Sequence, residues 1–363
     1  MAAFLITFLL FGLFLIVAPF GISPFEAPKV ILAEVAIELL LILTFFPFKK
    51  HHFKKLINPQ SIFILILFVL SMDGLLLFFS KDAFFGNPYR LQGVFLLWHL
   101  LIFSIISKDY KMGHYLKIIL PISFICLFLG TIILGVNENS RAFGTLGESN
   151  ALAAASLFIF PYLFFTYKGM IRIASIIITL AIILLSGSRA GLVGFIIQII
   201  FLILIKFFKI KVQKAVILSF IFIVLSLGIP FTEEGGWFEN RNIVWRTSLL
   251  AGLDSPLIGH GFGNIQSVIH TKALELNNNL KYQVVDSAHN FILDFWIQGG
   301  IVALVSVLML IALATFNFIK HKKILELTAI FGIIVAMSFN PVSVANLLSF
   351  WYLLGQGFQE SDS

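Results

Sequence analysis

The sequence predicts an all-α, polytopic membrane protein with about 12 transmembrane helices. Its 363 residues are 59% hydrophobic, and the mean hydropathy of +1.01 exceeds what a soluble domain can bury. Charged residues make up only 12% of the chain and concentrate between long apolar segments. We therefore expect a single integral membrane domain, residues 1–363. The positive-inside rule accounts for the net charge of +7, so nucleic-acid binding is not expected.

Apolar segments follow one another along the whole chain. A transmembrane helix needs about 20 apolar residues. Residues 2–20 lack the basic start and cleavage site of a signal peptide and are interpreted as a retained first span. The twelve candidate spans are 2–20, 30–47, 61–79, 93–107, 118–135, 150–167, 173–186, 190–205, 215–231, 289–315, 324–339 and 344–358.

Basic residues test this assignment, because they favour the cytoplasmic side. Every second connection is basic, and these five contain four, three, two, four and three of the 25 Lys and Arg residues: 49–55, 108–117, 168–172, 206–214 and 320–323. The alternation predicts a multi-pass protein of the cytoplasmic (inner) membrane with both termini cytoplasmic. The long polar interval 232–288, between candidate spans nine and ten, is then an extracytoplasmic loop.

Some ionisable residues fall inside predicted spans, where they are costly and often functional. Glu34 and Glu38 are four residues apart and share a helix face. A functional role and a role in bonding neighbouring helices both remain open for them. Asp73 and Asp294 also fall within spans, and His99 is interpreted as a hydrogen-bonded packing residue.

Two of the predicted outer loops contain candidate substrate-binding residues. In the first, Gly21-Ile-Ser-Pro-Phe-Glu26-Ala-Pro-Lys29, the lysine marks the outer end of the second span and, taken alone, is expected to be an interfacial anchor. In the third, Arg141 precedes Gly144, Gly147 and Asn150. Glycine lets backbone approach a ligand closely. Asn150 can cap the sixth span or point its amide into a cavity, and capping is the expected role.

The fourth outer connection, Ser186-Gly-Ser-Arg189-Ala-Gly191, is very short. It holds Arg189 at the membrane boundary among small residues that leave room for a ligand. A guanidinium group there can bind phosphate oxygens through two hydrogen bonds, and the start of the next helix adds partial positive charge. We therefore favour a functional role over a simple lipid anchor.

The long polar interval supplies the remaining candidates. Arg241 and Trp245 are four residues apart and share a helix face, with Arg246 beside them. His289 and Asn290 open the tenth span. A neutral imidazole is favoured near a helix N-terminus, and the neutral form is what a general base requires. A helix-capping His-Asn pair is the alternative.

These features point to transfer from a lipid diphosphate. Arginine can match the charge of a diphosphate leaving group without a metal, and His289 can accept the proton of an attacking sugar hydroxyl. The sequence contains no Asp-x-Asp pair to hold a divalent cation and no Gly-x-Ser-x-Gly motif of a serine hydrolase. No cofactor is expected.

In this order the motifs resemble the O-antigen ligase and O-antigen polymerase (Wzy-type) family of bacterial membrane glycosyltransferases. The resemblance implies a GT-C-like helical membrane fold. It also implies transfer of a glycan from an undecaprenyl-diphosphate-linked donor to a glycan or lipid acceptor, on the outer side of the cytoplasmic membrane among the membrane lipids, without metal and with inversion. It maps the catalytic histidine onto His289 and the paired arginines onto Arg189 and Arg241, with Arg246 as a competitor. The matching pieces are Pro24–Lys29, Arg141 to Asn150, Ser188–Gly191, Arg241–Trp245, Pro256–Asn264, and His289-Asn290 with Gly300.

Two departures from the family pattern leave alternatives open. Gly300-Ile-Val-Ala303 ends in alanine, and His260 in the glycine-rich turn is a rival base. The sequence does not separate a ligase from a polymerase. A transporter or flippase would concentrate polar residues near the bilayer midplane, whereas here they crowd one surface. A related polyprenyl-phosphate sugar transferase would use an acidic base, for which Glu26 is the candidate.

Overall fold

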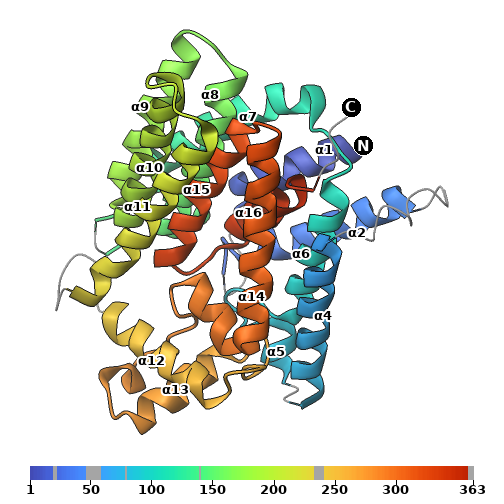
Figure 1. The fold of residues 1–363 in the computed structure, drawn as a ribbon, viewed down its shortest axis with the longest axis vertical. Coiled ribbons are helices and arrows are strands. Elements are labelled where there is room, and N and C mark those ends of the chain that lie inside the picture. Colours follow the sequence, from blue (N-terminus) through green and yellow to red (C-terminus); the bar gives the residue numbers. More distant parts are fainter. Residues whose placement is uncertain (19–22, 46–58, 78–79, 139, 233–240, 359–363) are drawn as a thin grey trace.

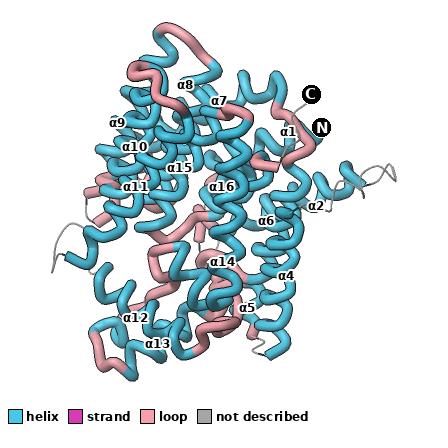
Figure 2. The backbone as a smooth tube through the Cα atoms, in the orientation of Figure 1, coloured by secondary structure: helices cyan, strands magenta, loops and turns pink. Residues whose placement is uncertain are grey.

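The computed structural model describes residues 1–18, 23–45, 59–77, 80–138, 140–232 and 241–358. Its regular elements are helices, apart from one isolated bridge between Val136 and Ala142 (Figure 2). This confirms the predicted all-α class for the part of the chain described.

A helix occurs at each of the twelve predicted apolar segments. The first segment is α1 (Ala2–Thr7), which continues into a π-helical turn (Phe8–Gly12) and a 3-10 turn (Leu13–Leu15). The others are α2 (Ala27–Phe45), α4 (Pro59–Leu77), α6 (Val94–Ser107), α7 (Gly113–Ile133), α8 (Ser149–Thr166), α9 (Met170–Ser186), α10 (Arg189–Lys206), α11 (Val212–Thr232), α14 (Phe291–Lys320), α15 (Ile324–Phe339) and α16 (Val344–Gln356).

Five of these helices, α4, α7, α8, α10 and α14, are long and apolar enough to cross a membrane. Five shorter apolar helices accompany them: Ala2–Leu15, Val94–Ser107, Met170–Ser186, Val212–Gly228 and Ile324–Phe339. An integral membrane protein is therefore supported. Twelve crossings remain a prediction.

Helices α8 and α15 form the centre of the bundle. Both are buried along most of their length, and α8 packs against α9, α10 and α15 (Figure 1). Small residues allow the close approach: a Cβ on Gly191 of α10 would lie 2.7 Å from the Cβ of Ala153 in α8. By contrast, apolar side chains on α4, α7 and α11 face outward, as expected of helices in lipid.

The long polar interval is itself helical where the structure describes it. It contains α12 (Arg241–Asp254), α13 (Ile265–Glu275) and a 3-10 turn (Asn279–Tyr282), while residues 233–240 lie outside the described part. In Figure 1, α12, α13 and α5 (Lys81–Phe85) occupy one end of the molecule. The α8–α9 and α10–α11 connections lie at the other end. The basic connections that the structure describes are thus separated from the polar interval.

Two glycines break α14 and dock the polar interval onto it. Gly299 and Gly300 leave the helical conformation, Gly300 with φ of 59°. The glycine-rich turn 256–263 supplies the missing hydrogen bonds: the N–H of Ile301 donates to the carbonyl of Pro256 (2.8 Å), and the N–H of Gly261 donates to that of Gln298 (2.9 Å). This docking fixes the interval over the start of α14, where His289 lies.

Candidate active site around His289

His289 lies just before α14 in a left-handed conformation with φ of 55°. The next residue, Asn290, caps the helix: its Oδ1 accepts from the N–H groups of Ile292 (2.9 Å) and Leu293 (3.4 Å). The N–H of His289 donates to Oγ of Ser287 at 3.0 Å. Its Nδ1 is buried and has no hydrogen-bond partner among the described residues.

The surroundings keep the His289 ring neutral. Burial and, to a smaller extent, the positive charge of Arg241 together lower the pKa of His289 to about 4. Asp286 opposes this effect less strongly. At neutral pH the ring is therefore unprotonated, and a buried nitrogen is available to accept a proton.

Arg241 begins α12 and reaches the end of α15. Its Nε donates to the carbonyl of Phe339, and its Nη2 donates to Oδ1 of Asn340 at 3.2 Å. Trp245, one turn later, is buried and packs its ring on Phe339 with centroids 5.8 Å apart. Arg246 is exposed. The turn of α12 thus directs Arg241 toward the histidine and Arg246 toward the surface.

A second group of predicted residues meets at the start of α10. Arg141 donates from Nε to the carbonyl of Ser186 and from Nη2 to Oδ1 of Asn150, both at 2.8 Å. Ser188 caps α10 by accepting from the N–H of Gly191 (3.2 Å), so Arg189 is its first residue and is exposed. The third outer loop therefore holds the Ser186–Arg189 turn.

The expectation that Asn150 caps a helix is wrong. Glu148 occupies the N-cap position of α8 without a side-chain capping bond. Asn150 lies inside the first turn, and its side-chain oxygen accepts instead from Arg141. A guanidinium group is a charged donor, so this hydrogen bond is stronger than a neutral cap.

Lys29 and Glu26 are buried rather than interfacial. The Nζ of Lys29 donates to the carbonyls of Phe25 (2.7 Å) and Thr145 (2.9 Å), which ties the first outer loop to the third. Glu26 accepts from the N–H of Val344 at 3.1 Å through Oε2. Burial raises the pKa of Glu26, and its Oε1 has no partner among the described residues.

Arg90, which sequence reasoning missed, connects these two groups. It lies between α5 and α6, donates from Nε to Asp286, and approaches Glu148 at 3.7 Å. Burial raises the pKa of Glu148 to about 7 against the opposing charge of Arg90. The available signal was an arginine within Asn87-Pro-Tyr-Arg90-Leu-Gln92, the second outer loop of the predicted topology.

The other polar candidates have local partners. The Nε2 of the rival base His260, in the glycine-rich turn, lies 2.8 Å from the carbonyl of Ala251 in α12. His99 bonds to the carbonyl of Phe95 (2.8 Å) and to Glu38 (3.3 Å), which confirms its interpretation as a packing residue. The Glu38 contact also supports the helix-bonding role for that residue. Asp294 accepts from the N–H of Ala288 at 2.7 Å.

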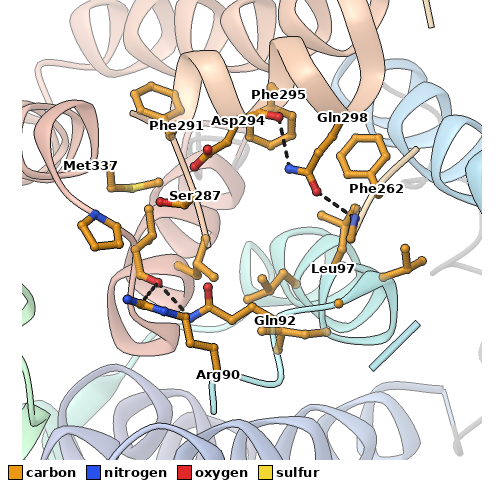
Figure 3. A pocket seen from close by; sticks show the side chains of 18 of the residues that line it. Arg90, Gln92, Leu97, Phe262, Ser287, Phe291, Asp294, Phe295, Gln298 and Met337 are labelled. Carbon is orange, nitrogen blue, oxygen red and sulfur yellow. Dashed lines mark hydrogen bonds between the residues drawn. The ribbon is translucent and has the colours of Figure 1, made fainter. Parts of the chain in front are cut away.

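Two cavities open beside this region and share part of their walls, including Arg90, Asp286, Ser287 and Asp294. Figure 3 shows Arg90 and Gln92 facing Ser287, Asp294 and Gln298 across one of them. The larger has a volume of about 360 Å³, within the range usual for small-ligand sites. The site therefore combines a cationic surface, a neutral histidine and an adjoining polar space.

Comparison with known proteins agrees with the motifs. Residues 174–308 match the model of a family described as O-antigen ligase. This segment contains Arg189, Arg241 and His289. A protein of Haemophilus influenzae described as uncharacterized is 25% identical over 181 residues, which cover 43% of this chain and 44% of that protein. The chain thus spans less than half of the length of that relative.

The match over residues 174–308 confirms the resemblance that the motifs predicted, and it places this segment of an apolar, all-helical chain with the O-antigen ligase family.

Proposed function

We propose that the protein is a membrane glycosyltransferase of the O-antigen ligase or polymerase type. It transfers a glycan from an undecaprenyl diphosphate lipid to an acceptor hydroxyl, on the outer side of the cytoplasmic membrane. The observation that carries the proposal is His289: an imidazole kept neutral beside Arg241, whose Nδ1 is buried and has no partner among the described residues. This is the environment expected of a general base.

In the proposed reaction, Nδ1 of His289 accepts the proton of the acceptor hydroxyl while the hydroxyl oxygen attacks the anomeric carbon. The bond from that carbon to the diphosphate oxygen breaks, and its electron pair leaves with undecaprenyl diphosphate. Arg189 and Arg241 match the charge that develops on the leaving group. Attack opposite the leaving group inverts the anomeric centre. The imidazolium then returns its proton to water.

The remaining predicted residues divide into supports and contacts. Arg141 and Asn150 hold the turn that presents Arg189, and Lys29 joins the loops behind it. Asn290 sets the start of the helix after His289. Their hydrogen bonds within the protein favour positioning roles. Trp245 packs beneath Arg241, and Arg246 is a peripheral contact for the lipid headgroup region.

Replacement of the arginines tests the proposal. We expect Arg189→Ala and Arg241→Ala each to abolish glycan transfer while membrane insertion is retained. Arg246→Ala, at the exposed arginine of the same helix as Arg241, is the matched control and should keep most activity. Assembly of surface polysaccharide at the normal level in Arg189→Ala would overturn the proposal.

Deletion of the protein separates the two activities of the family. A ligase that is lost leaves polymerised glycan on the lipid carrier. A polymerase that is lost leaves single repeat units attached to the acceptor. Because arginine supplies the countercharge, we also expect transfer by the purified protein to continue after treatment with EDTA.

A further inference from the structure

The two cavities beside His289 differ in their walls. The polar chamber lies between α5, α13 and the start of α14, and its wall includes Asp82, Gln266 and His270. The apolar chamber lies against α6, α14 and α16, and its wall includes Leu97, Phe291 and Trp351. Arg90, Asp286, Ser287 and Gln298 belong to both walls, so the chambers adjoin.

The polar chamber offers hydrogen bonds without a free positive charge. Among the described residues that line this chamber, Arg90 is the one with a lysine or arginine side chain. Asp286 and Glu148 already pair with it. Asp82 adds a negative charge at the start of α5. An anionic ligand would lose its hydration without gaining an unpaired cation, which is unfavourable. Uncharged hydroxyl groups can bond to the amide, imidazole and carboxyl groups.

The arrangement of α13 turns suitable side chains toward this space. Gln266 and His270 are four residues apart, so they share one face of the helix, and both line the chamber. Each can donate and accept hydrogen bonds, as sugar hydroxyls do. The neighbouring Thr271 is exposed on α13 and lies outside the wall.

Ser287 connects the chambers to the proposed base. Its Oγ accepts from the backbone N–H of His289 at 3.0 Å, and Ser287 is part of both walls. His289 itself is in neither wall, and a sugar held there would lie beside Ser287, two residues before the proposed base in the chain. The aromatic and aliphatic wall next to it matches the apolar C–H face of a pyranose ring, because small-ligand sites combine apolar walls with a few polar groups.

We propose that the two chambers bind an uncharged sugar residue of the acceptor, with its hydroxyl groups on α13 and α5 and its ring against the apolar wall. This inference rests on the proposed function, because it assigns the acceptor to one side of His289. The diphosphate of the donor then lies on the other side, at Arg189 and Arg241. The acceptor site discriminates by charge, against sugars that carry a carboxylate.

Saturation-transfer NMR on the full-length protein in nanodiscs tests the inference. The probes are methyl β-N-acetylglucosaminide, methyl β-glucoside and methyl β-glucuronide. We expect the two neutral glycosides to bind and the glucuronide to bind at least tenfold more weakly. The double variant Gln266→Ala/His270→Ala should weaken neutral binding about tenfold, whereas Thr271→Ala should leave it unchanged.

His289→Ala separates this inference from the proposed function. If both are correct, this variant retains glycoside binding but loses transfer. Glycoside binding with undiminished transfer in His289→Ala would reject the proposed base and keep the acceptor site. Equal binding of the glucuronide, or binding unaffected by the double variant, would reject the acceptor site whatever the transfer activity.

Discussion

His289 combines burial, which keeps its ring neutral, with a nitrogen that can accept a proton. A pKa lowered to about 4 means that the ring is unprotonated from about pH 5 upward. A histidine with an ordinary pKa near 6.5 would already have lost half of its basic form at pH 6.5 and nearly all of it at pH 5.

The pH dependence of transfer tests this assignment. We expect kcat/KM to hold steady as the pH falls from 8 to about 5.5 and to decline below pH 5, where His289 becomes protonated. Glu148, with a pKa of about 7, is a group that can add a separate inflection. The Glu148→Gln variant therefore serves as the control. A half-loss near pH 6.5 that persists in this variant would contradict a low pKa for the base.

Arg90 is the residue whose loss leaves the most charge uncompensated. Its side chain is 14% exposed and pairs with Asp286 (22%) and Glu148 (30%). Removing one partner of a buried ion pair costs about 3–5 kcal/mol, and partial exposure places this case near the lower end. We expect Arg90→Ala to lower the free energy of unfolding by about 3 kcal/mol.

Thermal unfolding in detergent measures this effect. Arg246→Ala removes an exposed arginine of the same site and should change the free energy of unfolding by about 0.5 kcal/mol or less. Equal melting temperatures for the two variants would show that Arg90 does not hold the loops together. Arg90→Lys should be intermediate, because lysine keeps the charge but not the planar donor geometry.

At the scale of single residues, the sequence predicted identity better than placement. His289, Arg189 and Arg241 stand out in the sequence because charge is scarce in this chain and these residues belong to motifs. The partners of Lys29 and Asn150 were not predicted. Lys29 bonds to residue 145 in a loop remote in sequence, and the bond of Asn150 to Arg141 depends on how the third outer loop folds back on itself. Arg90 was missed because it stands in no recognised motif.

At the scale of elements, the glycine-rich turn and the Gly299-Gly300 break form one unit. Gly300 has φ of 59° and ψ of −158°, a region that is essentially restricted to glycine. A Cβ there would lie 2.4 Å from the backbone carbon of Leu257. The break frees helix hydrogen bonds that the turn 256–263 then satisfies. The break at Gly299-Gly300 and the turn 256–263 therefore depend on each other for their hydrogen bonds.

Gly300→Ala tests this dependence. Strain at such a position costs about 1–3 kcal/mol, and the backbone clash adds to it. We expect a lower melting temperature and loss of transfer, because α13 and the start of α14 lose their docking. The control is Gly228→Ala on α11, where a Cβ meets nothing within 4 Å. That change should be neutral or slightly stabilising.

Helix positions were accessible to sequence reasoning because lipid requires long apolar runs. The predicted span 344–358 became α16 at Val344–Gln356, and 324–339 became α15 with the same ends. Within the polar interval, the sequence predicted only that Arg241 and Trp245 share a helix face. The extent of α12 and the existence of α13 were not predicted. Their amphipathic pattern is weak, and packing against α14 rather than local periodicity holds them.

At the scale of the whole molecule, the helices of the polar interval, α12 and α13, and the basic connections α8–α9 and α10–α11 lie at opposite ends (Figure 1). The positive-inside rule assigns the basic end to the cytoplasm. A lipid-linked donor would then meet Arg189, Arg241 and His289 on the outer side, and the chain would cross the membrane between the two ends.

Cysteine labelling tests this orientation. The single native cysteine, Cys126, is first replaced by serine. Arg246→Cys and Lys209→Cys then place one thiol at an exposed position near each end. A membrane-impermeant maleimide should label Arg246→Cys in intact cells and label Lys209→Cys only after the cytoplasmic membrane is opened. The reverse pattern would place His289 on the cytoplasmic side and contradict the orientation that the positive-inside rule predicts.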